Sequence, residues 1–145
     1  MEKSLSNYEE VNVSTADQGK LILMAYEGAI NFIKVAKERL SANDFAGKSI
    51  NISNAVAIIN ELRARLDIEK GGETAKNLDK LYIFLAMHLT TANLKKDTHK
   101  MDEAISILEN LHNDWVKIIE LTREKKIQNH EEIMTPAESF AHVCA

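Results

Sequence analysis

The sequence predicts an all-α fold, an antiparallel up-down four-helix bundle with a short N-terminal arm and a mobile C-terminal tail. Three observations support this prediction. The 145 residues include only five glycines and one proline, fewer turn residues than a sheet protein of this length needs. Apolar residues recur at helical spacing in four long segments. The breaks between those segments are about two to six residues long, so consecutive helices must pack antiparallel around one core.

The bundle domain is predicted over residues 15–127, between an arm over 1–14 and a tail over 128–145. The arm is polar apart from isolated apolar residues such as Tyr8. Thr15 and Gln18 have the spacing of a capping box, which predicts the start of the first helix. This helix is expected to end near Ser41-Ala42-Asn43. Its predicted inward face consists of Ile22, Tyr26, Ala29, Ile33, Ala36 and Leu40.

Asp44 is a suitable N-cap for the second helix, which Gly71-Gly72 is expected to end. The predicted core residues of this helix are Phe45, Ile52, Ala55, Ile59, Leu62 and Leu66. Glu73 lies in the first turn of the third helix, where a negative charge is favourable, and Lys95-Lys96-Asp97 breaks the pattern. The predicted inward face of the third helix consists of Leu78, Leu81, Leu85, His88 and Ala92.

The fourth helix has the most regular apolar spacing in the chain. Its predicted core residues are Met101, Ala104, Leu108, Leu111, Trp115 and Ile118. The periodicity fades after Lys126, and the tail contains Pro136. The low periodicity predicts a mobile tail, to which no function is assigned.

Charge and cysteine content exclude several classes of protein. The net charge is −4, with 18 basic residues spread among 22 acidic ones, so no basic surface is available for nucleic acid. The most apolar run, Leu21 to Tyr26, is far shorter than a bilayer span, and the acidic start lacks a signal-peptide pattern, so no membrane insertion is expected. The only cysteine, Cys144, cannot form an intramolecular disulfide, which favours a cytoplasmic protein.

The sequence contains no Gly-rich phosphate loop and no nucleophile elbow. Glu109 and His112 have the Glu-x-x-His spacing of a di-metal centre, but such a centre needs a second copy on another helix. His88 is expected about 10 Å from His112 along the bundle, partly buried and bonded to a neighbour. We therefore expect no enzyme, no catalytic residue, no cofactor and no metal. A di-metal oxidoreductase is the weakest alternative.

Surplus apolar residues are predicted to face away from the core. At 100° per residue, the outward positions of the second and third helices include Ile50, Ala57, Ala64, Ile68, Ile83, Met87, Thr90 and Leu94. Folding about Gly71 places Ala57 level with Leu85 and Ala64 level with Leu78, so the two stripes run side by side. Such a surface favours docking of an amphipathic segment, and Leu21, Leu23 and Met24 on the first helix add to it. Two alternatives stay open, a structural homodimer that pairs these faces and ordinary scattered apolar residues.

An ordered set of short motifs resembles the flagellar export chaperone family FliS. The set covers about residues 8–120, without any single specific motif. Its members are Tyr8 to Val13, Thr15-Ala16, Leu21 to Ala29, Ile58 to Leu62, Leu66-Asp67, Gly71-Gly72-Glu73, Asn77-Leu78, Leu81-Tyr82, Leu89, Ala92-Asn93 and Trp115. The sequence departs from the family pattern in two places. Ala25 replaces the usual leucine, which implies a smaller groove or core contact, and Asp17-Gln18 replaces a frequent Ser-Pro.

The resemblance implies a cytoplasmic chaperone that binds the C-terminal segment of flagellin in apolar surface grooves. It also implies that the chaperone prevents premature polymerisation and delivers flagellin to the flagellar type III export apparatus. Six residues fall on matching motif positions: Tyr8, Tyr26, Ile58, Leu62, Tyr82 and Asn93. Combined with the outward positions, the predicted client-binding set is Tyr8, Leu21, Met24, Tyr26, Ile50, Ala57, Ile58, Leu62, Tyr82, Ile83, Met87, Asn93 and Leu94.

Overall fold

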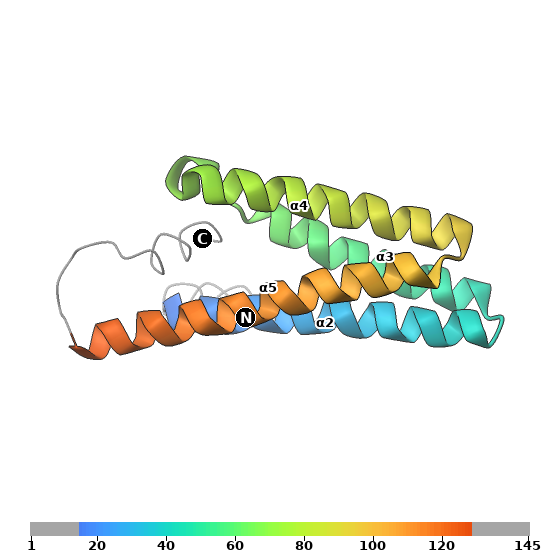
Figure 1. The fold of residues 1–145 in the computed structure, drawn as a ribbon, viewed down its shortest axis with the longest axis horizontal. Helices are drawn as coiled ribbons and strands as arrows, with labels where there is room; N and C mark the ends of the chain where they lie inside the picture. The colour runs from blue at the N-terminus through green and yellow to red at the C-terminus, as the bar shows by residue number, and fades with distance from the viewer. Residues whose placement is uncertain (1–14, 129–145) are drawn as a thin grey trace, which may run out of the picture.

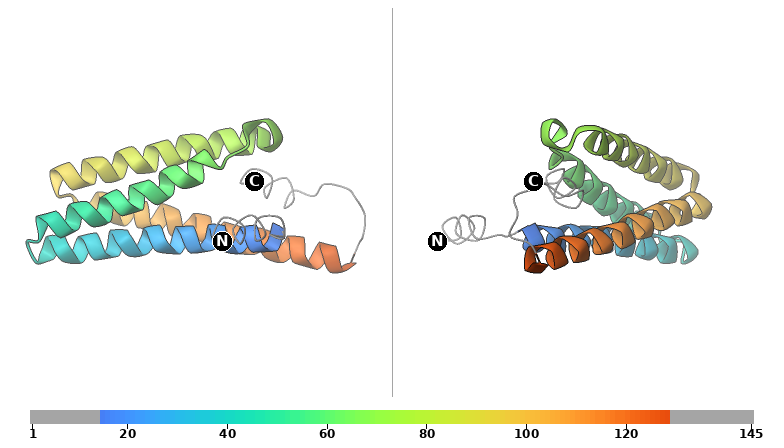
Figure 2. Two further views of the ribbon diagram at one scale, coloured as in Figure 1. Left: turned by 180° about the vertical axis from the view of Figure 1, so that it is seen from behind. Right: turned by 60° about the vertical axis from the view of Figure 1, so that its left-hand side comes forward.

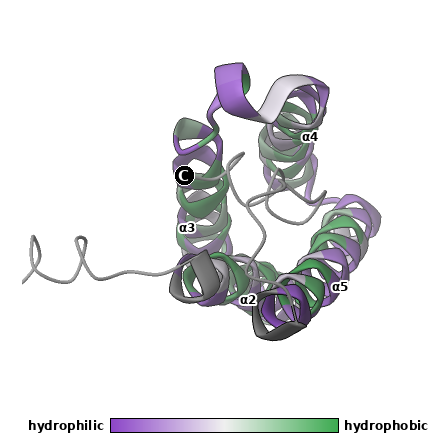
Figure 3. Ribbon diagram, turned by 90° about the vertical axis from the view of Figure 1, so that its left-hand side faces the viewer, coloured by the Kyte–Doolittle hydropathy of each residue, from purple (hydrophilic) through white to green (hydrophobic). Residues whose placement is uncertain are grey.

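The computed structural model describes residues 15–128, which form four helices joined by short turns (Figure 1). They are α2 (Thr15–Ser41), α3 (Phe45–Ala64), α4 (Ile68–Lys95) and α5 (Thr98–Gln128). Helices α2 and α4 each pack against both α3 and α5. The four helices therefore form a ring, which Figure 3 shows in a view along the bundle. This confirms the predicted all-α bundle, while the predicted arm and the tail after Gln128, with its expected mobility, lie outside the described residues.

Each turn ends on an aspartate that caps the helix after it. Carboxylate oxygens accept hydrogen bonds from the backbone N–H three residues on, at 2.9 Å for Asp44, 3.0 Å for Asp67 and 3.2 Å for Asp97. These bonds satisfy N–H groups that have no partner inside the helix. The predicted cap at Asp44 is confirmed, and the other two caps define the remaining turns.

The expected helix end at Gly71-Gly72 is wrong. Helix α3 ends at Ala64, and α4 begins at Ile68, directly after the cap Asp67. Gly72 instead kinks α4, with φ 57° and ψ −133°, a backbone conformation that favours glycine. The residues from Arg65 to Gly72 together reverse the chain. Residues of α3 and α4 therefore lie opposite each other as they would if the chain folded at Gly71.

Most of the predicted core is confirmed, with differences on α4 and at Phe45. Four further residues of the predicted core are only half-buried: Leu40, Leu66, Leu111 and Ile118. The buried apolar residues of α4 repeat at spacings of three and four: Ala75, Leu78, Tyr82, Leu85, Leu89 and Ala92. Leu81 and His88, which were predicted to face inward, are half-buried at the edges of this stripe. Phe45 is exposed at the end of the bundle, where its ring lies 4.0 Å from the Lys96 ammonium, a cation–π distance.

A polar contact joins three helices inside the core. The Tyr26 and Tyr82 hydroxyls lie 2.5 Å apart, and Trp115 Nε1 donates to the Tyr26 hydroxyl over 3.0 Å. All three side chains are buried. Their hydroxyl and indole groups are thereby satisfied, as buried polar groups need to be.

Helices α2 and α5 approach closely at Gly19. A Cβ atom added there would lie 2.7 Å from Ile119 Cδ1, so a larger residue would have to displace the Ile119 side chain. This contact sets the level of α2 against α5 near the N-terminal end of α2 and the C-terminal end of α5. Beyond it, the last turns of α5 extend past the start of α2 (Figures 1 and 2).

Candidate functional site

The outer faces of α3 and α4 lie side by side, in the register that the sequence predicts. Arg63 Nε lies 2.7 Å from Asp79 Oδ1, and Ser49 Oγ lies 3.1 Å from Asn93 Oδ1 at the other end of the pair. Ala57 is midway between these contacts on α3, level with Leu85 on α4. The outward apolar side chains of the two helices therefore form one surface.

The most exposed large apolar side chains in the described part of the chain belong to this surface. Leu94 is 79% exposed, Met87 66% and Ile50 61%. Ala57 is exposed between them, and Ile83 is half-buried. This surface, formed by Ile50, Ala57, Ile83, Met87 and Leu94, is called the α3–α4 face below. Methionine adapts to partners of different shape, so its place here suits docking of a peptide segment.

A hollow of about 290 Å³ runs between α3 and α4 within this face. Its walls combine aliphatic side chains with amides and hydroxyls, from Ile52, Ser53, Val56, Ala57, Asn60, Thr90 and Asn93. The aliphatic groups can bury a partner side chain, and the amides and hydroxyls can bond a partner's backbone. The α3–α4 hollow therefore suits a peptide segment more than a small apolar ligand.

Asn93 is held in place by two residues of α3. Its backbone oxygen accepts a hydrogen bond from Lys48 Nζ over 2.9 Å, and its side-chain oxygen accepts from Ser49. Lys48 is only 4% exposed, and its ammonium group satisfies a carbonyl near the C-terminal end of α4. Lys48 is not among the residues predicted from the sequence, although its position four residues before Ile52 continues the core stripe of α3.

A second hollow, of about 240 Å³, lies between α2 and α3. It is lined by Leu21, Ile22, Ala25, Ile58, Glu61, Leu62 and Arg65. The walls are mostly aliphatic, and the two charged lining residues form a pair, with Arg65 Nε 3.4 Å from Glu61 Oε1. The methyl side chain of Ala25 leaves space that a longer side chain would fill. This α2–α3 hollow therefore suits one or two apolar side chains of a helix.

A third hollow, between α2 and α5, has a different character. It measures about 370 Å³ and is lined by Glu27, Ile30, Asn31, Lys34, Glu109, His112 and Asn113. His112 Nε2 lies 3.1 Å from Glu27 Oε1, which gives this histidine a structural partner on α2. The charged and amide groups make this hollow a poor site for an apolar segment.

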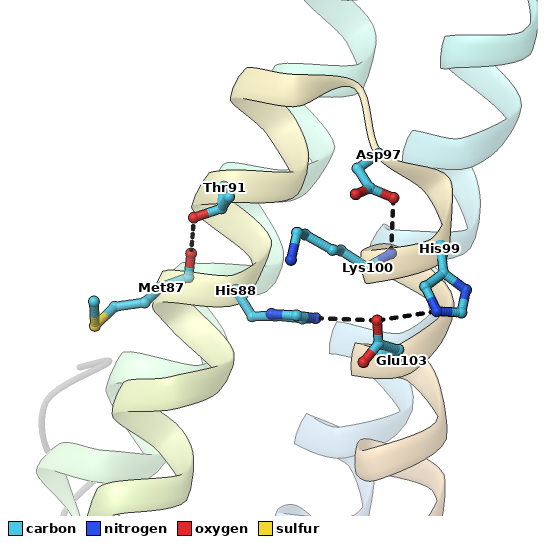
Figure 4. Close-up of polar contacts among 7 residues, drawn as sticks. All are labelled: Met87, His88, Thr91, Asp97, His99, Lys100 and Glu103. Atoms are coloured by element: carbon cyan, nitrogen blue, oxygen red, sulfur yellow. Dashed lines mark hydrogen bonds and ion pairs between the residues drawn. The ribbon is translucent and has the colours of Figure 1, made fainter.

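His88 connects α4 to α5, as Figure 4 shows. Its ring stacks on Phe84, with centroids 4.9 Å apart, and its Nε2 lies 3.8 Å from Glu103 Oε1. His99 Nε2 lies 3.3 Å from the same oxygen. The predicted hydrogen bond of His88 to a neighbour is absent: its buried Nε2 has no hydrogen-bond partner among residues 15–128. No group of three or more His, Cys, Asp or Glu is placed to hold a metal ion within that same range.

The structure divides the predicted client-binding residues into three groups. On the surface or lining a hollow are Leu21, Met24, Ile50, Ala57, Ile58, Leu62, Ile83, Met87, Asn93 and Leu94. Tyr26 and Tyr82 are fully buried, because their hydroxyls meet at the centre of the core, so this structure does not present them to a partner. Tyr8 lies outside the described residues.

The helices of the described chain include none long and apolar enough to cross a membrane.

Comparison with known proteins gives consistent matches over most of the chain. The family model for flagellar protein FliS matches residues 1–122. The flagellar secretion chaperone FliS of Vibrio cholerae is 34% identical over 122 residues, which cover 81% of this chain and 90% of the relative. The FliS of Salmonella typhimurium is 37% identical over 110 residues, with coverages of 75% and 82%. The flagellar secretion chaperone FliSB of Pseudomonas aeruginosa is 33% identical over 117 residues, with coverages of 78% and 93%.

Proposed function

The chain belongs to the FliS family of flagellar proteins, and from this membership we propose that it is a flagellar secretion chaperone whose client is flagellin. It binds the C-terminal segment of flagellin across α2, α3 and α4. By covering that segment it prevents premature polymerisation, and it then delivers flagellin to the flagellar type III export apparatus from the cytoplasm.

The observation that carries this proposal is the uncharged surface of α3. Residues 49–60 contain no charged side chain, although Ile50, Ala57 and Asn60 are exposed. A helix on the surface of a soluble bundle normally has charged residues on its outer face. An uncharged outer face, flanked by a hollow on each side, is typical of a helix that lacks a packing partner.

The two hollows beside α3 suit two parts of one client segment. The aliphatic α2–α3 hollow accepts side chains from the apolar face of a client helix. The α3–α4 hollow, with Asn60 and Asn93 at its walls, can also bond the backbone of an extended stretch. A segment that lies across α3 therefore contacts both hollows, and it gains its order only on binding.

Co-purification with flagellin tests this function. Full-length flagellin is expected to be recovered with the chain, and flagellin without its C-terminal segment is not. Equal recovery of both forms would contradict the chaperone assignment. If neither form is recovered and light scattering shows a dimer, the structural homodimer is the better description.

A variant of α3 locates the surface in the same assay. Ala57→Glu places a carboxylate at the α3–α4 hollow, which a bound apolar segment would have to desolvate, so recovery of flagellin should be lost. Asn110→Glu is the matched control, because it adds the same charge at an exposed position on α5. Equal loss with both variants would indicate a general effect of charge and would count against the α3–α4 hollow.

A further inference from the structure

The α2–α3 hollow lies toward the end of the bundle where α5 finishes. Gly19 of α2 is level with Ile119 of α5, because the two residues are in contact distance. From Ile119, α5 continues to Gln128 and ends about 13 Å further along the bundle. The hollow begins at Leu21, just on the other side of the Gly19 level. The end of α5 and the centre of the hollow are therefore about 20 Å apart along the bundle axis.

The chain after α5 is long enough to return to this hollow. Seventeen residues, 129–145, follow Gln128 and lie outside the described residues. The twelve residues from 129 to 140 span up to about 40 Å when extended, twice the axial separation. The extended segment can also cover the extra distance around α2, so Phe140 can reach the hollow without any change in the bundle.

The composition of residues 129–145 matches the hollow. The segment has four large apolar residues, Ile133, Met134, Phe140 and Val143. It also has three glutamates and no lysine or arginine, and the one cation that lines the hollow, Arg65, is paired there with Glu61, so the match rests on the apolar residues. Thr135 and Glu138 have capping-box spacing with Pro136 between them, a pattern that favours a helix start just before Phe140. Phe140 and Val143 then share one apolar face.

We propose that residues 129–145 of this chain occupy the α2–α3 hollow in the free protein, with Phe140 beside Ala25, and that flagellin displaces them. The docking itself does not depend on the proposed function, because it involves only the hollow and the segment. Its regulatory role rests on the proposed function, because it makes part of the client-binding surface unavailable until a client competes for it. Tethering gives the segment a high effective concentration, so even a weak contact occupies the hollow.

The single cysteine allows a direct test of the docking. A nitroxide label on Cys144 of the full chain broadens the NMR signals of nearby amides. The expected result is broadening at Leu21, Ala25 and Ile58, and none at Met87 or Leu94 on α4. Phe140→Ser in the labelled chain should remove it. Broadening that is absent, or centred on α4, would overturn the proposal.

A second copy of the chain is the competing occupant. Labelled chains without isotope enrichment are mixed with enriched, unlabelled chains, so that any broadening must come from another molecule. The proposal predicts no broadening of the hollow in this mixture. Broadening at Leu21 and Ala25 here would assign the hollow to a dimer contact and would overturn the proposal.

Affinity for the C-terminal segment of flagellin tests the competition. Phe140→Ser should raise that affinity roughly three- to tenfold, because the hollow no longer has to be vacated. Ala25→Leu should lower it, because the added side chain fills the hollow for tail and client alike. Asn110→Ser on the exposed face of α5, outside both the hollow and the segment, is the matched control and should leave affinity unchanged. An unchanged affinity with Phe140→Ser would contradict the regulatory role. No binding of the segment by any form, with the label still at the hollow, would contradict the flagellin function and leave the docking intact.

Discussion

At the scale of single residues, Tyr26 and Tyr82 show how a family motif can report the core instead of the binding surface. Both fall on motif positions, yet both are fully buried, and their hydroxyls meet each other and Trp115. A tyrosine hydroxyl in the core of a bundle needs a polar partner, and here the hydroxyls of Tyr26 on α2 and Tyr82 on α4 are partners of each other. The pattern of residues alone could not separate this role from a contact with the client.

Tyr82→Phe tests the structural role of this tyrosine. The change removes one hydroxyl from the buried contact while the ring stays in place, and the Tyr26 hydroxyl keeps Trp115 as a partner. We expect a loss of about 1 kcal/mol in the free energy of unfolding, measured by urea denaturation. Affinity for the flagellin segment should change less than about twofold, well under 1 kcal/mol. A stable variant that binds much more weakly would place Tyr82 in the binding surface after all.

Leu85→Ala tests the phase of α4. Leu85 is fully buried at the centre of the stripe formed by Leu78, Tyr82 and Leu89. Truncation should cost roughly 2 to 5 kcal/mol through lost burial and the cavity that remains. Urea denaturation measures this cost, and a loss below about 0.5 kcal/mol would fit an exposed position instead.

At the scale of the helices, capping residues determine the boundaries more reliably than glycines do. Glycine commonly terminates helices, so Gly71-Gly72 predicts an end of the second helix at that point. Asp67 caps Lys70 instead and starts α4 earlier, so Gly72 becomes a kink. The same cap signal, applied to Asp67 as it was to Asp44, would have given the correct boundary.

Met87→Glu tests the outer face of α4 separately from its core. Met87 is 66% exposed and points away from the stripe of Leu85 and Leu89. The variant should keep its helicity by circular dichroism and lose at most about 0.5 kcal/mol of stability. Its affinity for the flagellin segment should fall a hundredfold or more, since burying the carboxylate costs a few kcal/mol. A variant that unfolds would instead place Met87 in a packed interface.

At the scale of the whole molecule, the fold follows from the sequence more completely than the site does. Helical spacing and three short breaks are sufficient for a four-helix ring, and folding about Gly71 gives the correct level of Ala57 against Leu85. The hollows could not be predicted in this way, because each depends on the sizes of neighbouring side chains on two helices. The α2–α3 hollow, for example, needs the small Ala25 opposite Ile58 and Leu62.

Calorimetry tests the predicted mode of binding. A flagellin segment that folds on the apolar α3–α4 face and in the α2–α3 hollow buries apolar surface, so the heat-capacity change on binding should be negative. The segment should gain helix by circular dichroism. Added salt should weaken binding only mildly, because most contact residues are uncharged and the two charged ones, Glu61 and Arg65, are paired with each other. A steep loss of affinity with salt would indicate an electrostatic surface elsewhere on the bundle.

In the proposed complex, the C-terminal segment of flagellin lies across α3 and the flanking faces of α2 and α4. Methyl-resolved NMR of the full chain, titrated with that segment, tests it most directly. Binding at this surface should give large shifts for the methyl groups of Met24, Ala57, Ile58 and Met87, and almost none for Ile107 on α5. Shifts confined to α5, with the methyl groups of α3 unchanged, would contradict it.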